Sequence, residues 1–321
     1  MTEFKASPEA QDLSDPARLI ARMRSGERRA TSRAVTELER LSAAAPALLE
    51  AMRSHLGHTL VIGFTGPPGA GKSTLVNAYT RHLREDNKSI AIIAVDPSSP
   101  ISGGAILGDR IRMTATLDDD GVFMRSLASR GHLGGLCPAA VRVIDAFDAA
   151  GKDIVLLETV GTGQSEIDVA EVADVRIVVT APGLGDDIQA MKSGLLEVAD
   201  IIVVNKADRE GAERTAQQLK GALSLRSGPR ANVPVLKVTA TTGDGVPALA
   251  NAIDDFAVAG VPKDPLVRRR RRARYLIARA AAELVSTRVR EGAGGELDQL
   301  ADAVLAGTLL PSDAAAKLLK R

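Results

Sequence analysis

One stretch decides the fold of this chain: Gly66-Pro67-Pro68-Gly69-Ala70-Gly71-Lys72-Ser73-Thr74. It matches the phosphate-binding pattern G-x-x-x-x-G-K-[ST] at every fixed position. The apolar residues 59–64 come before it and indicate a strand, and a helical pattern begins at Leu75. In this setting the glycine N–H groups and the positive end of the helix dipole would bind phosphate. Lys72 would reach the β- and γ-phosphates and Ser73 would bind Mg²⁺; the alternative is a glycine-rich turn without a ligand.

Composition excludes several classes of protein. The 41 Lys and Arg residues nearly balance the 40 Asp and Glu residues, so no general attraction to nucleic acid or to an anionic membrane is expected. A single cysteine, Cys137, excludes a disulfide framework. The chain has no apolar run of 18 residues and no secretory signal at its start. We therefore expect a cytoplasmic protein with neither a nucleic-acid nor a membrane partner.

Apolar runs between helical patterns predict an α/β fold. These runs are nearly continuous, which is typical of strands buried on both faces of a parallel sheet, and they cover residues 59–64, 89–95, 153–158, 175–181, 200–205 and 233–238. We expect a P-loop NTPase with a doubly wound, mostly parallel sheet. The predicted organisation is a helical N-terminal extension over residues 1–57, a nucleotide-binding domain over 58–262 and a helical C-terminal arm over 263–321.

The two flanking regions show helical spacing. In the extension, Asp15 followed by Pro16 predicts a helix start, with Asp as the N-cap. In the arm, a long helical pattern from Leu266 to Arg290 carries an apolar stripe that either folds back on the sheet or packs against a second copy. The basic run Arg268–Arg272 is expected to be a solvated face rather than a dock for RNA or an acidic partner.

A second motif indicates which base is bound. Asn205-Lys206-Ala207-Asp208 matches N-K-x-D directly after an apolar run. The Asp208 carboxylate would accept hydrogen bonds from guanine N1–H and from its exocyclic amine, and adenine has no such pair of donors. Thr239-Ala240-Thr241 follows the next run, where GTPases place a loop whose backbone N–H contacts guanine O6. The alternative for the N-K-x-D segment is a solvated turn.

Acidic residues at two other strand ends are candidates for metal binding and hydrolysis. Glu158 stands where small GTPases have the Asp of D-x-x-G, and it would bind Mg²⁺ through a water or orient the nucleophile. Asp96 closes the second run, and Asp109 follows in a loop rich in glycine. Gln164 lies three residues beyond Gly161, so we do not assign it the water-orienting role of the Ras glutamine. Each acid could instead be a solvated residue of a turn.

Taken together, the motifs resemble one family. They occur in its order, at residues 66–74, 94–99, 103–110, 158–166 and 205–208. The chain is similar to the MeaB/MMAA-type (ArgK-like) GTPases, which are chaperones of adenosylcobalamin-dependent methylmalonyl-CoA mutase. The resemblance implies that the chain binds GTP, GDP and Mg²⁺, with Ser73, Asp96, Asp109 and Glu158 at the metal and Lys72 and the three acids in hydrolysis.

The resemblance also implies switch segments and an assembly. Residues 185–192, with Asp186, Asp187 and Lys192, look like the family's additional switch loop, and Gly161 and Gln164 lie in another. The C-terminal helices resemble its homodimerisation arm. We therefore expect a GTPase that gates cofactor loading onto the mutase and protects that enzyme. The alternatives are a protein kinase of a basic amino acid transport system, a nickel-delivery GTPase and a non-catalytic scaffold.

Overall fold

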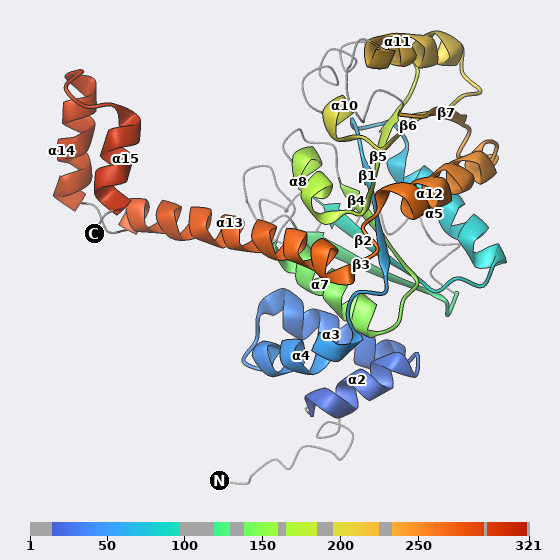
Figure 1. Ribbon diagram of the computed structural model, residues 1–321, viewed down its shortest axis with the longest axis horizontal. Coiled ribbons are helices and arrows are strands. Elements are labelled where there is room, and N and C mark those ends of the chain that lie inside the picture. Colours follow the sequence, from blue (N-terminus) through green and yellow to red (C-terminus); the bar gives the residue numbers. More distant parts are fainter. Residues whose placement is uncertain are drawn as a thin grey trace. The chain divides into compact units, whose positions relative to one another are not determined.

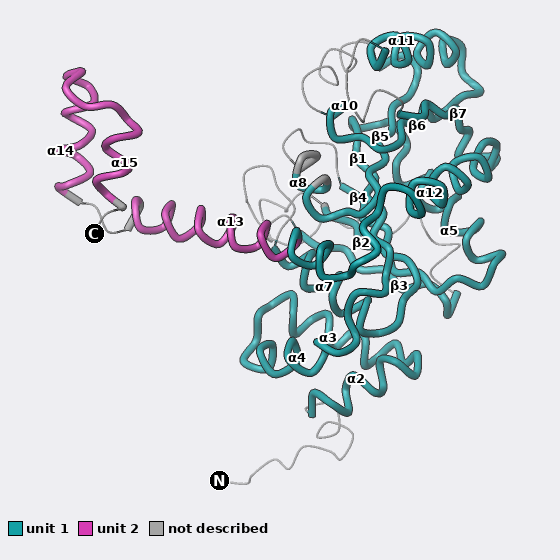
Figure 2. Tube along the Cα trace, viewed as in Figure 1, with its two compact units in different colours: residues 1–271 teal, residues 272–321 magenta. Residues whose placement is uncertain are grey.

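The computed structural model describes residues 15–96, 119–128, 138–159, 165–184, 195–224, 233–291 and 294–319. Figure 2 shows its division into two compact units, residues 1–271 and residues 272–321. The three-part organisation expected from the sequence stays a prediction. Of the helices within the described residues, none combines the length and the apolar composition needed to cross a membrane.

Unit 1 is built on a seven-stranded sheet in which every neighbouring pair is parallel (Figure 1). In chain order the strands are β1 (Leu60–Thr65), β2 (Ile90–Asp96), β3 (Val122–Ala128), β4 (Ile154–Thr159), β5 (Val175–Thr180), β6 (Ile201–Asn205) and β7 (Val235–Val238). Their order across the sheet is β3-β2-β4-β1-β5-β6-β7, which places β1 at the centre. The α/β prediction is confirmed.

One strand was absent from the sequence prediction. β3 lies at an edge of the sheet, and the polar residues Arg125 and Ser126 interrupt its apolar run. Arg125 forms an ion pair with Glu39 of the N-terminal helices, so its positive charge is balanced by a carboxylate within the fold. Two consecutive polar residues in the middle of β3 break the nearly continuous apolar run by which the other strands were recognised.

Helices cover both faces of the sheet (Figure 1). On one face, α5 (Lys72–Glu85) and α12 (Val246–Gly260) pack on alternate residues of the strands, including Ile62 and Phe64. On the other face, α8 (Ser165–Val172) packs on β1, and α10 (Leu195–Val198) and α11 (Ala212–Ser224) cover β6. α8 approaches β1 so closely that a Cβ built on Gly63 would lie 2.3 Å from Cγ1 of Val169.

The N-terminal helices belong to unit 1. They are α2 (Pro16–Arg24), α3 (Arg28–Arg40), α4 (Ala45–Met52) and the 3-10 turn η1 (Arg53–His55), and they pack on α7 (Pro138–Ala149). Asp15 caps α2 as predicted, because its Oδ1 accepts the N–H of Ala17 at 3.0 Å. Arg142 of α7 donates to the carbonyl oxygen of Leu38, so the contact between α3 and α7 is polar as well as apolar.

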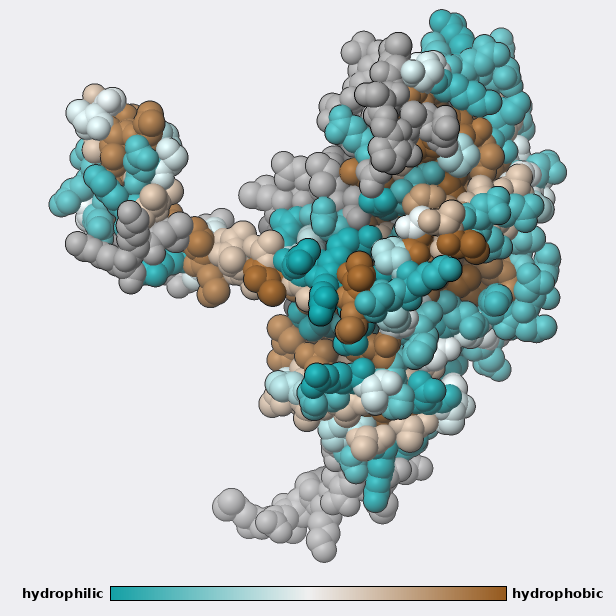
Figure 3. Space-filling model, viewed as in Figure 1, coloured by the Kyte–Doolittle hydropathy of each residue, from teal (hydrophilic) through white to brown (hydrophobic). Residues whose placement is uncertain are grey.

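The long helix α13 (Pro265–Glu291) begins in unit 1 and continues into unit 2, where α14 (Gly294–Leu305) and α15 (Pro311–Leu319) follow. Figure 3 shows apolar side chains along this helix. Unit 2 exposes four large apolar residues by 66–85 %: Ile277, Leu284, Leu305 and Leu310. The prediction that Arg268–Arg272 form a solvated face is wrong, because Arg268 and Arg271 bind the fully buried carboxylate of Asp174.

Candidate nucleotide-binding site

The phosphate-binding motif forms the connection between β1 and α5. Thr65 ends β1 and Lys72 begins α5, so the amino end of a helix faces the loop, as the sequence predicted. Gly66, Gly69 and Gly71 have φ angles of 137°, 77° and 85°, which side chains rarely adopt. A Cβ on Gly66 would lie 2.0 Å from the carbonyl oxygen of Val179, so the loop also needs glycine there for space. Pro67 is buried, and Pro68 and Thr74 are exposed.

The ammonium group of Lys72 lies inside this loop. Its Nζ donates to the carbonyl oxygens of Gly66 at 2.8 Å and Pro67 at 3.0 Å, and the residue is 7 % exposed. A buried ammonium group is costly unless its donors are satisfied, and here the loop carbonyls satisfy them. The positive charge therefore lies at the centre of the loop, where it would attract a bound phosphate.

Ser73 and Glu158 meet directly beside the loop. The hydroxyl of Ser73 donates to Oε1 of Glu158 at 2.6 Å, and Glu158 is 4 % exposed. The contact follows from the sheet, because β4 pairs with β1 and places Glu158 opposite Phe64 in register. A serine hydroxyl and a carboxylate at a phosphate-binding loop are the hard oxygen ligands that Mg²⁺ prefers. The donor set thus fits the predicted metal.

Asn205 links this loop to the base side of the site. Its Nδ2 donates to the carbonyl oxygens of Ala70 at 2.9 Å and Gly71 at 3.3 Å, and its Oδ1 accepts the N–H of Ala240 at 3.1 Å. Lys206, in the left-handed backbone region at φ 55°, donates from Nζ to the carbonyl oxygen of Gly69 at 2.7 Å. The N-K-x-D segment is therefore hydrogen-bonded directly to the phosphate loop.

The two base-side segments also contact each other. The N–H of Ala207 donates to the carbonyl oxygen of Val238 at 3.1 Å, which joins the turn after β6 to the end of β7. Asp208 and Thr241 are exposed, whereas Thr239 and Ala240 are buried. Thr239 is held by the carbonyl oxygen of Asp244, which accepts its N–H at 2.9 Å. The Asp208 carboxylate is therefore open to a ligand, on a backbone that is held in place.

Some predicted residues cannot be placed. The backbone of Asp96 ends β2 at the same edge of the sheet, and its side chain is outside the described part of the structure. Six further predicted residues lie outside the described ranges: Asp109, Gly161, Gln164, Asp186, Asp187 and Lys192. The structure thus brings together Lys72, Ser73, Glu158, Asn205 and the Thr239–Thr241 segment.

Sequence reasoning missed two buried carboxylates near the other end of β1. Asp148 is 2 % exposed and accepts the N–H groups of Gly57, His58 and Thr59 at 2.5, 3.0 and 3.0 Å. Asp174 accepts the N–H of Val61 at 3.1 Å. In the sequence, each of these two residues is only an acidic residue inside or directly beside an apolar run. A solvent-exposed acid at the end of a helix or strand gives the same pattern, so the sequence did not predict their burial.

A central parallel strand that leads into this loop, with N-K-x-D at the end of β6, defines a P-loop GTPase. Comparison with known proteins agrees. The profile of the family described as methylmalonyl Co-A mutase-associated GTPase MeaB matches residues 31–294, and the chain belongs to this family. The predicted resemblance is confirmed, and membership implies that the chain binds GTP and GDP.

Individual relatives cover most of the chain. It is 41 % identical over 308 residues to a protein of Pyrococcus horikoshii, covering 94 % of this chain and 97 % of that one. It is 41 % identical over 252 residues to the GTPase ArgK of Escherichia coli, covering 76 % of each. A crystal structure described as the LAO/AO transport system kinase has 30 % identity and a TM-score of 0.75, covering 96 % of this chain and 97 % of that one.

Proposed function

We propose that this protein is a GTP-hydrolysing chaperone that gates adenosylcobalamin loading onto methylmalonyl-CoA mutase and protects that enzyme. The family description, which couples a GTPase to this mutase, supports the client. The contact between Ser73 and Glu158 supports the chemistry, since it puts a metal-binding hydroxyl and a carboxylate 2.6 Å apart beside the phosphate loop.

In this proposal the loop holds the β- and γ-phosphates through its N–H groups and the amino end of α5. The Lys72 ammonium group, which now donates to two loop carbonyls, would donate to phosphate oxygens instead. Water attacks the γ-phosphorus, and the bond between the γ-phosphorus and the β-phosphate oxygen breaks. Lys72 would stabilise the negative charge that develops during this step. Ser73, with Glu158, Asp96 and Asp109, would hold Mg²⁺, which neutralises charge on the β- and γ-oxygens. The products are GDP and phosphate.

The base side selects guanine. Asp208 would accept the two donors of guanine, and the N–H groups of Thr239–Thr241 would face its O6. Asn205 keeps both parts of the site at a constant separation, because one side chain bonds to each. Adenine would leave the Asp208 carboxylate without a donor on that edge, at a cost in affinity.

The proposal also includes two switch segments that respond to the bound nucleotide and a homodimer formed by the C-terminal arm. The segments with Gly161 and Gln164 and with Asp186, Asp187 and Lys192 would report the γ-phosphate to the client. The C-terminal arm would pair two chains into a homodimer. Ile277 and Leu284 support this, because they are 69 % and 71 % exposed, lie seven residues apart on one face of α13, and would lose contact with water against a second chain.

Capture of a purified cobalamin-dependent mutase on the immobilised protein tests the proposal. Capture should differ at least about fivefold between GDP and a non-hydrolysable GTP analogue, which corresponds to a coupling of about 1 kcal/mol. Lys72→Ala should lose the difference, whereas the exposed control Lys88→Ala should keep it. Equal capture with both nucleotides, when both bind, would contradict the chaperone role.

The kinase alternative has one observation in its favour, the description of the similar crystal structure. With GTP labelled at the γ-phosphate, a GTPase releases labelled phosphate into solution. Label transferred to a protein or to a basic amino acid would favour the kinase instead.

A further inference from the structure

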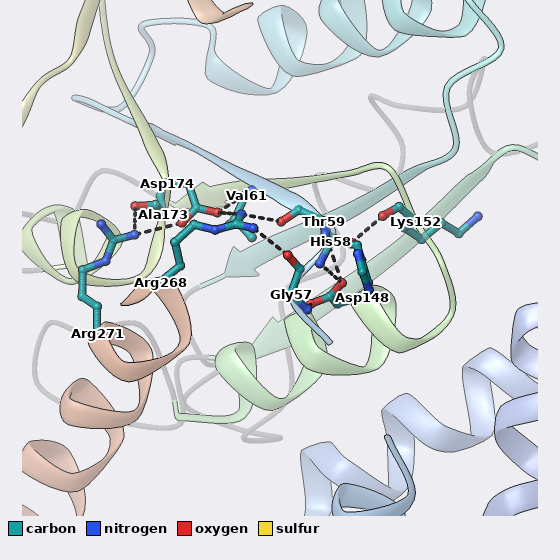
Figure 4. Close-up of polar contacts among 10 residues, drawn as sticks. All are labelled: Gly57, His58, Thr59, Val61, Asp148, Lys152, Ala173, Asp174, Arg268 and Arg271. Atoms are coloured by element: carbon teal, nitrogen blue, oxygen red, sulfur yellow. Dashed lines mark hydrogen bonds and ion pairs between the residues drawn. The ribbon is translucent and has the colours of Figure 1, made fainter. Parts of the chain in front are cut away.

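Two arginines of α13 converge on one buried carboxylate of the GTPase fold (Figure 4). Asp174, whose side chain is fully buried, lies between α8 and β5. Its Oδ2 is 3.3 Å from Nη1 of Arg268, and its Oδ1 is 3.0 Å from Nη2 of Arg271. The same Oδ2 accepts the N–H of Val61 in β1. One side chain therefore joins β1, the end of α8 and the start of α13.

The arginines also bind backbone on both sides of Asp174. Arg268 donates to the carbonyl oxygens of Gly57 at 2.6 Å and Thr59 at 3.1 Å, directly before β1. Arg271 donates to the carbonyl oxygen of Ala173 at 2.7 Å, directly after α8. Figure 4 shows the two guanidinium groups on opposite sides of the Asp174 carboxylate. The first turns of α13 are thus bound to two elements that lead toward the nucleotide site.

The first of those elements is β1. It runs from this cluster to Thr65, and the phosphate loop follows at once. Asp148 holds the N–H groups of residues 57–59, so the start of the strand is fixed from a third direction. β1 is hydrogen-bonded to β4 on one side and to β5 on the other, so the cluster and the phosphate loop lie at the two ends of one strand that is bonded along its length.

The second element is α8. Its first residue, Ser165, follows Glu158 by seven positions in the sequence, and its last turn leads to Ala173 and Asp174. Val169 and the methyl group of Ala173 lie against Gly63 with no room for a methyl group between them. A shift of α8 along β1 therefore changes the position of Asp174 relative to Arg268 and Arg271.

We propose that Asp174, Arg268 and Arg271 are positioning residues that couple the nucleotide bound at the phosphate loop to the first turns of α13. This rests on the proposed function of the loop. Paired guanidinium–carboxylate contacts are sensitive to geometry, so a small shift of the carboxylate exchanges one set of bonds for another. The buried Nε of Arg268 has no hydrogen-bond acceptor within the described residues, so this donor is available for a rearranged set of contacts.

Hydrogen exchange followed by mass spectrometry tests the coupling on the full chain. Amides of residues 266–271 should exchange at least about threefold more slowly with a non-hydrolysable GTP analogue than with GDP, because the γ-phosphate restrains the elements that hold Asp174. Asp174→Asn and Arg268→Lys should remove that difference. Arg268→Lys keeps the charge but replaces the planar guanidinium, whose Nη1 bonds Thr59 and Asp174 and whose Nη2 bonds Gly57, by a single nitrogen on a different stem.

A matched control separates coupling from loss of stability. Glu39→Gln breaks the ion pair with Arg125 of β3, a strand separated from β1 by β2 and β4, and it should keep the nucleotide-dependent difference. Calorimetry on each variant reports GDP and GTP-analogue binding. Equal exchange in the wild type with both nucleotides bound would overturn the coupling alone. Absence of nucleotide binding would overturn the proposed function as well. Arg268→Lys also tests the coupling if Asp174→Asn fails to fold.

Discussion

The side-chain nitrogen of Asn205 lies 2.9 Å from the carbonyl oxygen of Ala70, and its side-chain oxygen accepts the N–H of Ala240. A residue of the predicted base-recognition motif thus spans the distance between the phosphate loop and the loop after β7. The two halves of the site are held at a constant separation by one amide, so binding at one half depends on the geometry of the other.

Asn205→Ala should therefore weaken GDP and GTP together. Its three hydrogen bonds are lost and buried loop groups lose their partner, which costs about 1–3 kcal/mol, or roughly 5- to 150-fold in affinity. Calorimetric titration measures the change, with the exposed Asn251→Ala as the control. Unchanged affinity would mean that the two loops keep their positions without this residue.

Asp208→Asn should change the base that is preferred. The asparagine amide has an N–H₂ donor where the aspartate carboxylate has an acceptor. The exocyclic amine of guanine therefore loses its acceptor, whereas xanthine, which has a carbonyl at that position, can accept a hydrogen bond from the new amide. We expect GTP affinity to fall by at least about 100-fold and XTP to become the better ligand. Competition binding measures both, and Glu210→Gln, an exposed neighbour in the same turn, should alter neither.

Glu158→Gln should lower hydrolysis far more than binding. The amide keeps an oxygen to accept the Ser73 hydroxyl at 2.6 Å but loses the negative charge that attracts Mg²⁺. We expect kcat to fall about 100-fold and the Mg²⁺ concentration for half-maximal activity to rise. Phosphate release at several Mg²⁺ concentrations tests this, with Glu171→Gln on the exposed face of α8 as the control. Wild-type activity in Glu158→Gln would exclude Glu158 from the site.

Asp148→Ala should destabilise the fold. Three buried N–H groups lose a charged acceptor at once, and we expect a loss of roughly 3–5 kcal/mol in the free energy of unfolding. Urea unfolding measures the change, and the exposed Asp86→Ala should stay within about 0.5 kcal/mol of the wild type. A loss below about 1 kcal/mol would show that water replaces the carboxylate.

Asp119 should make a pH-dependent contribution to stability. The hydrogen bond from Arg84 chiefly lowers the pKa of this carboxyl below its ordinary value of 3.8. A lowered folded-state pKa stabilises the protein above that ordinary value, and the contribution is lost as pH falls through the folded-state pKa. Compared with Asp119→Asn, the wild type should be more stable at pH 7 by at most about 1 kcal/mol, because the pair is partly exposed. The advantage should shrink below about pH 4 in urea unfolding.

Local patterns were sufficient for much of this protein. The loop at residues 66–74 and the N-K-x-D segment are contiguous, so their chemistry depends on neighbours in the chain, and both lie where strand ends were expected. Asp15 and Pro16 predicted a helix start because a cap is satisfied within three residues. Six of the seven strands were recognised. Five of them, β1, β2, β4, β5 and β6, are almost entirely buried, which leaves nearly continuous apolar runs, whereas β7 at the sheet edge is partly exposed and has a single charged residue, Lys237, in its run. β3 has Arg125 in its middle and gave no such run.

The order of the strands and the long-range contacts were decided only by the tertiary structure. Ser73 and Glu158 are 85 residues apart, and only the pairing of β4 with β1 brings them together. Arg268 and Arg271 looked like a solvated basic run because the sequence did not reveal Asp174 as their buried partner. A charge pattern describes one helix face, whereas burial depends on what the rest of the chain places against that face. The phosphate loop and the base motif could therefore be recognised from contiguous residues, whereas the partners of Glu158, Arg268 and Arg271 depend on how the chain folds.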